Sequence, residues 1–238
     1  MRPISPSQYI ANMKRIATTI ACMLIAAAGL PQATDDLRTN AEIAEQIRQL
    51  AQQGGDTYDQ QVRLVWVLVM RSVQGDPEAH KHGKPAAERL AGSNELNPRA
   101  RFAYGFLRYK EAFDTRDPVT RKRRIDEGRR AMTESLPMGA RDGDFCFDAG
   151  FVLAGLPADA NLYREAANTL AIARRLFGDK FAALEAPRRA DWEVAMAAAL
   201  EKAGIIELAR EHYQAAYSVA PDSPSGRMAQ IWLRTHGG

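Results

Sequence analysis

Two histidines separated by one residue, His80 and His82, are the side chains in this 238-residue chain whose types and spacing best suit a metal site. Imidazole groups are common zinc ligands. Residues two apart lie on the same side of an extended segment, not of a helix. The two remaining histidines, His212 and His236, are remote in sequence. We therefore expect a solvated loop at His80 and His82, with no metal and no cofactor. The alternative is a helical accessory subunit or small metal-dependent enzyme with a site there.

A second cluster is basic, because residues 121–124 read Arg-Lys-Arg-Arg and Arg129 and Arg130 follow. Such a cluster could hold a phosphate group or an acidic partner. Asp126 and Glu127 interrupt it, however, and they stand four residues from basic side chains. Opposite charges at that spacing pair along one helix face. The pattern favours a solvated helix face stabilised by i,i+4 ion pairs.

The net charge gives no sign of a nucleic-acid partner. The chain has 32 basic and 29 acidic residues, and three of the basic ones but none of the acidic ones lie in residues 1–33. The rest of the chain therefore holds 29 of each and is electrically balanced. Broad affinity for nucleic acid or for an anionic membrane surface is not expected from such a balance.

Motifs that would indicate an enzyme are absent from the sequence. It contains no G-x-S-x-G, no H-E-x-x-H and no glycine-rich phosphate-binding loop. Beyond residue 33 its one cysteine is Cys146, which stands between Phe145 and Phe147. A single thiol cannot form an internal disulfide, and its aromatic neighbours indicate a buried structural residue. We predict that the protein is not an enzyme.

Residues 1–33 have the pattern of a secretory signal. A Lys-Arg pair precedes the apolar run 16–30, which is shorter than the about 20 residues of a membrane helix. An A-x-A cleavage site ends at Ala28, and cleavage after Ala33 is a second option. We expect a cleaved signal and a periplasmic or cell-envelope protein. An uncleaved N-terminal anchor is the alternative and would be the only link to the membrane; lipidation at Cys22 is a weaker one.

The remainder is expected to be all-α, because alanine is abundant and β-branched residues are sparse. Residues 34–75 are predicted to form an N-terminal helical pair, with helices at 40–53 and 57–73. The second helix contains a β-branched apolar run that favours a buried helix, with a buried strand as the alternative. Residues 76–98 are polar and contain glycine and proline, so we predict a linker with a short helix at 86–91.

Residues 99–238 are predicted to form a domain of repeated helices. We expect these at residues 99–113, 118–136, 144–156 and 161–177, in a pair over 191–221 that turns at Ala203 and Gly204, and at 223–235. Gly105 within the first helix indicates close approach to a neighbouring helix. The same helix carries an aromatic row at helical spacing: Phe102, Phe106, Tyr109 and Phe113. Core packing is its expected role, and a groove for an apolar peptide is the alternative.

One spacing of small and large residues recurs in this domain: a small residue, three positions, a large apolar residue, two positions and a second small residue. It occurs at Ala209, Tyr213 and Ala216, at Ala166, Leu170 and Ala173, and in weaker form at Gly128, Met132 and Ser135. Small residues let two helices pack closely, and the large residue fills the gap between neighbouring pairs. One pair cannot bury its faces alone, so pairs are expected to stack.

Residues 197–221 resemble the tetratricopeptide repeat (TPR) family. The family's small residue in the first helix falls on Ala197, its turn glycine on Gly204 and its closing proline on Pro221. The match is partial over residues 147–178 and poor over 99–137, and the intervals exceed the family period of about 34 residues. The resemblance implies an all-α fold that is a right-handed superhelical stack of helix-turn-helix pairs, a TPR-like α-solenoid, with the final helix as its cap.

The resemblance also implies a scaffold that binds a peptide or protein partner in a groove lined by first helices. The residues that it places in the groove are Asp148 and Phe151 in one repeat and Asp191, Val194, Ala198, Glu201 and Lys202 in the next. The alternative is that several of these side chains pack against a neighbouring helix. Repeat scaffolds of this kind do not reveal the identity of the partner.

Overall fold

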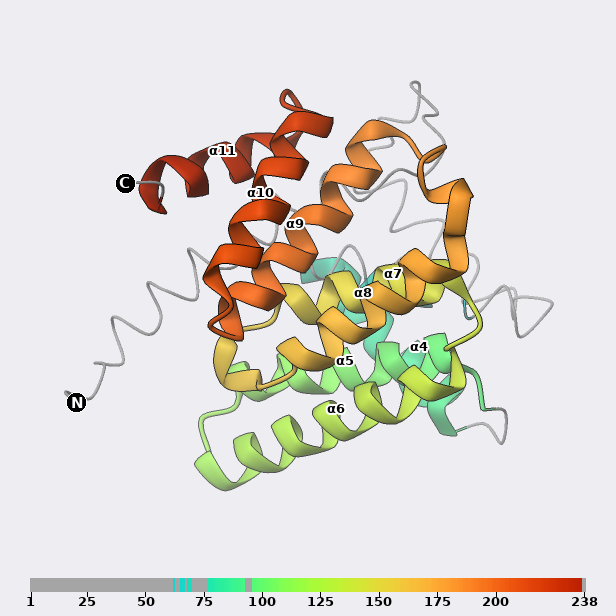
Figure 1. Ribbon diagram of the computed structural model, residues 1–238. Coiled ribbons are helices and arrows are strands. Elements are labelled where there is room, and N and C mark those ends of the chain that lie inside the picture. Colours follow the sequence, from blue (N-terminus) through green and yellow to red (C-terminus); the bar gives the residue numbers. More distant parts are fainter. Residues whose placement is uncertain (1–61, 63–64, 67, 70–76, 93–95, 237–238) are drawn as a thin grey trace.

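The computed structural model describes residues 62, 65–66, 68–69, 77–92 and 96–236, and within this part the chain is helical with no strand (Figure 1). The all-α prediction is therefore confirmed there. The α-helices are α4 (Pro77–Gly92), α5 (Pro98–Asp114), α6 (Pro118–Met138), α7 (Gly143–Gly155), α8 (Tyr163–Phe177), α9 (Ala186–Lys202), α10 (Ile206–Val219) and α11 (Pro224–His236). Short 3-10 turns span Ala158–Ala160 and Gly178–Phe181.

Three helices begin at a polar residue that caps their first turn. The side chain of Asn97 accepts hydrogen bonds from the backbone N–H groups of Arg99 and Ala100 at the start of α5. Asp117 caps α6 and Asp142 caps α7 in the same way. Proline at the first position of α5 and α6 costs no hydrogen bond, because that N–H has no partner inside a helix. These caps place the helix starts within a residue or two of the predicted ones.

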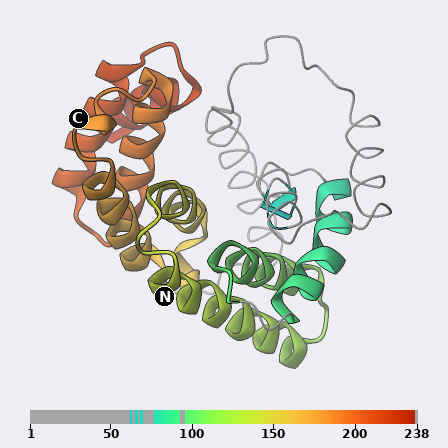
Figure 2. The same cartoon turned by 90° about the vertical axis from the view of Figure 1, so that its right-hand side faces the viewer.

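Consecutive helices pack against each other as pairs, α5 with α6, α7 with α8 and α9 with α10, and α11 packs on α10 and α9. Viewed as in Figure 2, these helices follow an arc from α4 to α11. The recurring small–large–small residues lie in the second helix of each pair, and all nine are buried. The packing role predicted for this spacing is therefore confirmed in α6, α8 and α10.

The crossing of α5 and α6 depends on two glycines that face each other. A Cβ atom on Gly105 would lie 2.7 Å from the carbonyl oxygen of Gly128, and one on Gly128 would lie 2.6 Å from the carbonyl oxygen of Gly105. Both contacts are to backbone, which cannot move aside without separating the helices. The close approach predicted from Gly105 is confirmed, and Gly128 is its partner.

The prediction of a linker at residues 76–98 with a short helix at 86–91 is wrong in the extent of the helix. Most of this segment is helical, because α4 spans Pro77–Gly92. Gly83 is typical of a loop, yet here it lies where a Cβ atom would come within 3.1 Å of the Leu68 side chain. Pro85 is also typical of a loop, and it lies at an exposed position inside the helix. Both residues are tolerated within α4, which packs on α5.

The apolar run before α4 is helical at each of its described positions, residues 62, 65, 66, 68 and 69. These residues are buried and belong to the same hydrophobic core as α5 and α7, apart from Leu68, which contacts α4. The buried helix favoured over a strand is confirmed at these positions. The predicted helix at 40–53, the secretory signal and Cys22 lie outside the described residues. In the described part, no helix is long and apolar enough to cross a membrane.

Candidate partner-binding site

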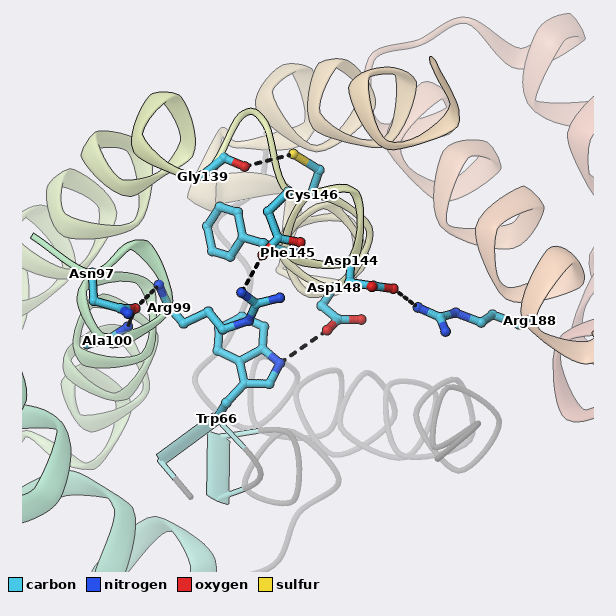
Figure 3. Close-up of polar contacts among 11 residues, drawn as sticks. Trp66, Asn97, Arg99, Ala100, Gly139, Asp144, Phe145, Cys146, Asp148 and Arg188 are labelled. Atoms are coloured by element: carbon cyan, nitrogen blue, oxygen red, sulfur yellow. Dashed lines mark hydrogen bonds and ion pairs between the residues drawn. The ribbon is translucent and has the colours of Figure 1, made fainter. Parts of the chain in front are cut away.

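Trp66 contacts residues that lie far from it in the sequence. Its indole Nε1–H donates a hydrogen bond of 3.1 Å to the Oδ2 atom of Asp148 on α7 (Figure 3). The ring centroid lies 5.7 Å from that of Phe102 on α5 and 6.1 Å from that of Phe145 on α7. The guanidinium carbon of Arg99 lies 6.0 Å from the same indole. Tilted ring pairs and a nearby cation suit the negative face and positive edge of an aromatic ring.

Asp148 is a carboxylate in surroundings that disfavour its charge. It keeps partial solvent exposure, yet burial raises its pKa to about 6. The hydrogen bond from Trp66 and the positive charges of Arg188 and Arg99 offset only part of that rise. A carboxyl group whose pKa is displaced toward neutrality by burial is a recognised mark of functional sites, although structural networks produce it too.

Two arginines from different helices reach the beginning of α7. Arg99 Nη1 lies 2.5 Å from Asp142 Oδ2, and Arg188 Nη2 of α9 lies 2.6 Å from Asp144 Oδ1 (Figure 3). Burial alone would raise the pKa of Asp142, but hydrogen bonds from Arg99 and from the Phe145 backbone hold that pKa below its usual value. We call this group the inner face: Arg99, Asp142, Asp144, Asp148 and Arg188, whose side chains are partly exposed, over Phe102 and Phe145, which are buried in the core beneath them.

The seven residues predicted to line a groove lie on α7 and α9, where they contact their own chain. Asp148 belongs to the inner face. Phe151 is buried and stacks on Phe147, with ring centroids 6.5 Å apart. Val194 and Ala198 are buried in the core of α9, and Glu201 accepts a 3.0 Å hydrogen bond from the Tyr213 hydroxyl. Their role toward a partner stays a prediction; within the structure, Phe151, Val194, Ala198 and Glu201 follow the packing alternative.

Asp191 joins α9 to α11. It is fully buried, its Oδ1 atom accepts a hydrogen bond from the Ser225 hydroxyl, and its Oδ2 atom is a buried acceptor with no hydrogen bond. Burial raises the pKa of Asp191 to about 7, against the lowering effects of Ser225 and Arg188. A carboxyl group in this position is more easily buried protonated than charged.

This burial predicts a pH-dependent stability. Because the folded pKa of Asp191 lies above the unfolded one, its contribution is complete below about pH 4 and is lost as the pH rises toward 7. The contribution of Asp191 should fall by on the order of 3 kcal/mol across this window, and Asp191→Asn should remove that part of the slope, while the smaller part due to the raised pKa of Asp148 remains. Urea unfolding between pH 4.5 and pH 7.5 measures it. Asp179→Asn, at an exposed position, is the control and should leave the slope unchanged.

Lys202 ties the end of α9 to the end of α7. Its Nζ atom donates hydrogen bonds to the carbonyl oxygens of Ala154 and, at 2.7 Å, Leu156. Burial lowers the pKa of this amine to about 8, and the charge of Glu201 opposes that lowering. The side chain predicted to face a groove therefore satisfies carbonyl groups that α7 leaves unpaired at its C-terminus.

Replacing Lys202 with methionine should leave these carbonyl groups without their donor. We expect the free energy of unfolding to fall by about 1–3 kcal/mol, the cost of an unsatisfied buried polar group. Thermal unfolding followed by circular dichroism checks this expectation. Lys180→Met, at an exposed position, should change the midpoint little; equal effects of the two substitutions would show that the carbonyl contacts contribute nothing.

The basic cluster of α6, Cys146 and the aromatic row of α5 have structural roles in the described part of the chain. Lys122 pairs with Asp126 at 2.8 Å and Arg123 with Glu127 at 3.7 Å, so the predicted i,i+4 ion pairs of the basic helix are confirmed. Cys146 is buried, and burial raises the pKa of its thiol to about 11, as expected of a structural residue. The aromatic row of α5 is buried at Phe102, Phe106 and Tyr109 and half-buried at Phe113, which confirms core packing.

The loop predicted at His80 and His82 is wrong, because both residues lie within α4. Residues two apart do not share a helix face. The alternative metal site there is untested, since these two side chains are outside the described part of the chain. Among the side chains that are described, no group of three or more histidine, cysteine or acidic residues is arranged to hold a metal ion.

A pocket of about 400 Å³ lies between α4, α5 and α6, where its lining includes Arg101, Tyr104 and Arg108. Arg101 pairs with Glu134, and Arg108 with Glu127 at 3.0 Å. Its two arginines are therefore already matched by carboxylates, which weakens any case for an anion there.

Sequence reasoning missed Arg99, Arg188 and the pairing of Trp66 with Asp148. The signal that was available is a single tryptophan inside the apolar run at 57–73, since tryptophan is the side chain most able to anchor an interface. Comparisons of the chain with protein-family models, curated proteins and solved structures give no match.

Proposed function

We propose that the protein is an exported, TPR-like helical scaffold that binds a peptide or protein partner on its inner face. The observation that carries this proposal is the network on that face, where α5, α7 and α9 bring two arginines and three aspartates around an aromatic centre. The aromatic centre is buried in the core, so a partner would meet the partly exposed arginine and aspartate side chains above it. Charged groups of this kind favour a partner of complementary charge and set specificity more than affinity.

The TPR-like part of the proposal is supported by the three helix pairs and by the buried small–large–small spacing in each second helix. In this proposal the pairs continue as a right-handed superhelix, with α11 as the cap. First helices α5, α7 and α9 then supply the binding surface, and second helices α6, α8 and α10 supply the packing. This division matches the location of the inner-face residues on first helices.

Partner capture tests the binding proposal. The full chain, purified under native conditions, is used to retain proteins from an envelope extract. We expect a partner to be retained by the wild type and lost when Arg188 is replaced with glutamate, because that change places like charges beside Asp144 and alters the rim. Arg130→Glu on the exposed surface of α6 is the matched control and should retain the partner. Equal retention by all three proteins would contradict an inner-face interface.

The export proposal rests on the signal-like residues 1–33. Fusing residues 1–40 to a reporter that is active only outside the cytoplasm should give activity, and changing Lys14 and Arg15 to glutamate should reduce it, since the positive n-region drives signal recognition. An inactive fusion would assign the scaffold to the cytoplasm. Metal analysis of untagged protein addresses the alternative enzyme at His80 and His82, and we expect no stoichiometric metal.

A further inference from the structure

Helix α11 docks on the fold through polar groups that are buried without full hydrogen bonding. Asp191 of α9 is 0 % exposed; its Oδ1 atom accepts a hydrogen bond from the Ser225 hydroxyl of α11, and its Oδ2 atom has no partner. Trp232, two turns beyond Ser225 on α11, has a buried indole N–H that also lacks an acceptor. A buried polar group without a partner costs free energy, and contact with water removes that cost. Undocking of α11 would therefore relieve both groups.

The other contacts of α11 that involve large or polar side chains are made with α10. Trp232 stacks on Tyr213, with ring centroids 4.4 Å apart and ring planes inclined by 26°. Arg210 donates a hydrogen bond of 3.1 Å to the carbonyl oxygen of His236 at an exposed position. Because α11 is the last helix in the described part of the chain, its release separates no other described pair of helices (Figure 1). Beside its apolar packing, α11 is thus fastened by one aromatic stack and by the pair of Asp191 with Ser225.

The Asp191 carboxyl has little nearby to balance a negative charge. The positive charge that acts on it is that of Arg188, one turn earlier on α9, and Arg188 is itself paired with Asp144 of α7 at 2.6 Å. Burial raises the pKa of Asp191 to about 7 for this reason. A neutral carboxyl tolerates the position, whereas a carboxylate there is a buried charge without a full partner. Ionisation of Asp191 therefore favours the state in which α11 has left.

Other ionisable groups lie on the helices that pack around α9 and α11, and their effects must be separated from that of Asp191. His212 of α10 bonds to Glu193 of α9 at 2.6 Å. His236 of α11 stacks on Trp232, with ring centroids 4.6 Å apart. Further polar contacts of these helices lie elsewhere: Lys202 with α7 carbonyl groups, Glu201 with Tyr213, Arg227 with the Asp222 carbonyl oxygen, and, between α8 and α9, the uncharged hydrogen bond from Trp192 to the Leu170 carbonyl oxygen.

We propose that α11 is a pH-sensitive latch, which lies docked on α9 and α10 while the Asp191 carboxyl is protonated and undocks as that group ionises. The carboxylate, the Ser225 hydroxyl and the Trp232 indole N–H then all meet water. The latch is closed in acid and released toward neutral pH. Helix α11 has 13 residues, and an isolated helix of that length is marginal in water, so its amide groups exchange once it is free. This response does not depend on what the inner face binds.

Hydrogen exchange of the full chain, followed by mass spectrometry, tests the latch. The rate in each peptide is divided into the intrinsic rate at the same pH to give a protection factor. Protection of α11 should fall about tenfold per pH unit between pH 5 and pH 7 and then level off, because the docked state keeps one proton that the free state loses. Protection of α11 should also stay below that of α9 at each pH, since a latch opens before the core does. Asp191→Asn should abolish the fall.

His212→Gln and His236→Gln are the controls, and both should keep the wild-type fall in α11 protection. Ser225→Ala removes the hydrogen bond and keeps the carboxyl, so it should lower α11 protection by about tenfold at pH 5. This variant decides the question if Asp191→Asn does not fold, since unchanged α11 protection in Ser225→Ala would overturn the proposal. So would α11 protection that equals that of α9, that is constant between pH 5 and pH 7, or that loses its fall in a histidine variant.

Discussion

Replacing Trp66 with alanine is expected to lower the free energy of unfolding by about 3–5 kcal/mol, the range for truncating a buried tryptophan. The ring is 9 % exposed and contacts both Phe102 and Phe145. Its removal leaves a cavity and also leaves Asp148 without the indole donor. Urea unfolding at pH 7 measures the change.

The control for this substitution is Ile231→Ala, since Ile231 is 63 % exposed and its truncation should stay within about 0.5 kcal/mol of the wild type. A loss below about 1 kcal/mol for Trp66→Ala would mean that the contacts of Trp66 add little to the fold. A double-mutant cycle with Trp66→Phe and Asp148→Asn isolates the hydrogen bond, for which we expect a coupling of about 1.5–3 kcal/mol.

Replacing Gly105 with alanine should destabilise the α5–α6 crossing by about 1–3 kcal/mol, as overpacking of a close contact does. The new Cβ atom would meet two backbone atoms of α6 at 2.7 Å, the Gly128 carbonyl oxygen and the Met132 nitrogen. Alanine is otherwise the better helix residue by about 1 kcal/mol, so a net loss must come from the crossing. Thermal unfolding followed by circular dichroism tests it.

Gly128→Ala should have a similar effect, because its Cβ atom would meet the Gly105 carbonyl oxygen and the Tyr109 nitrogen of α5. Gly92→Ala at the end of α4 is the control, since nothing lies within 4 Å of a Cβ atom there. A neutral or higher unfolding midpoint for both Gly105→Ala and Gly128→Ala would show that α5 and α6 are farther apart in solution.

Helix positions in the C-terminal two thirds followed from local chemistry. Asn97 and Asp117, each before a proline, fix the starts of α5 and α6 through hydrogen bonds that need no tertiary contact. The buried small residues also followed, because Ala166 and Ala209 recur at a spacing that only close packing explains. These are properties of neighbouring residues, which a sequence displays directly.

The inner face could not be predicted, because its parts meet only in the fold. Arg99 and Asp142 are 43 residues apart, and Arg188 and Asp144 are 44 apart. No local pattern pairs them. The error at α4 arose from local patterns, because Gly83 and Pro85 are typical of loops when tertiary contacts are ignored. In the fold, Gly83 lies close to the Leu68 side chain and so has a packing role inside a helix. The repeat position of Lys202 predicts that it faces a groove, whereas in the fold its Nζ atom donates hydrogen bonds to carbonyl groups at the end of α7.

Hydrogen exchange of the full chain, alone and with the captured partner, tests the inner-face interface most directly. We predict slower amide exchange at the start of α5 and of α7 on binding. Protection confined to α6, α8 and α10, with exchange at α5 and α7 unchanged, would contradict the account.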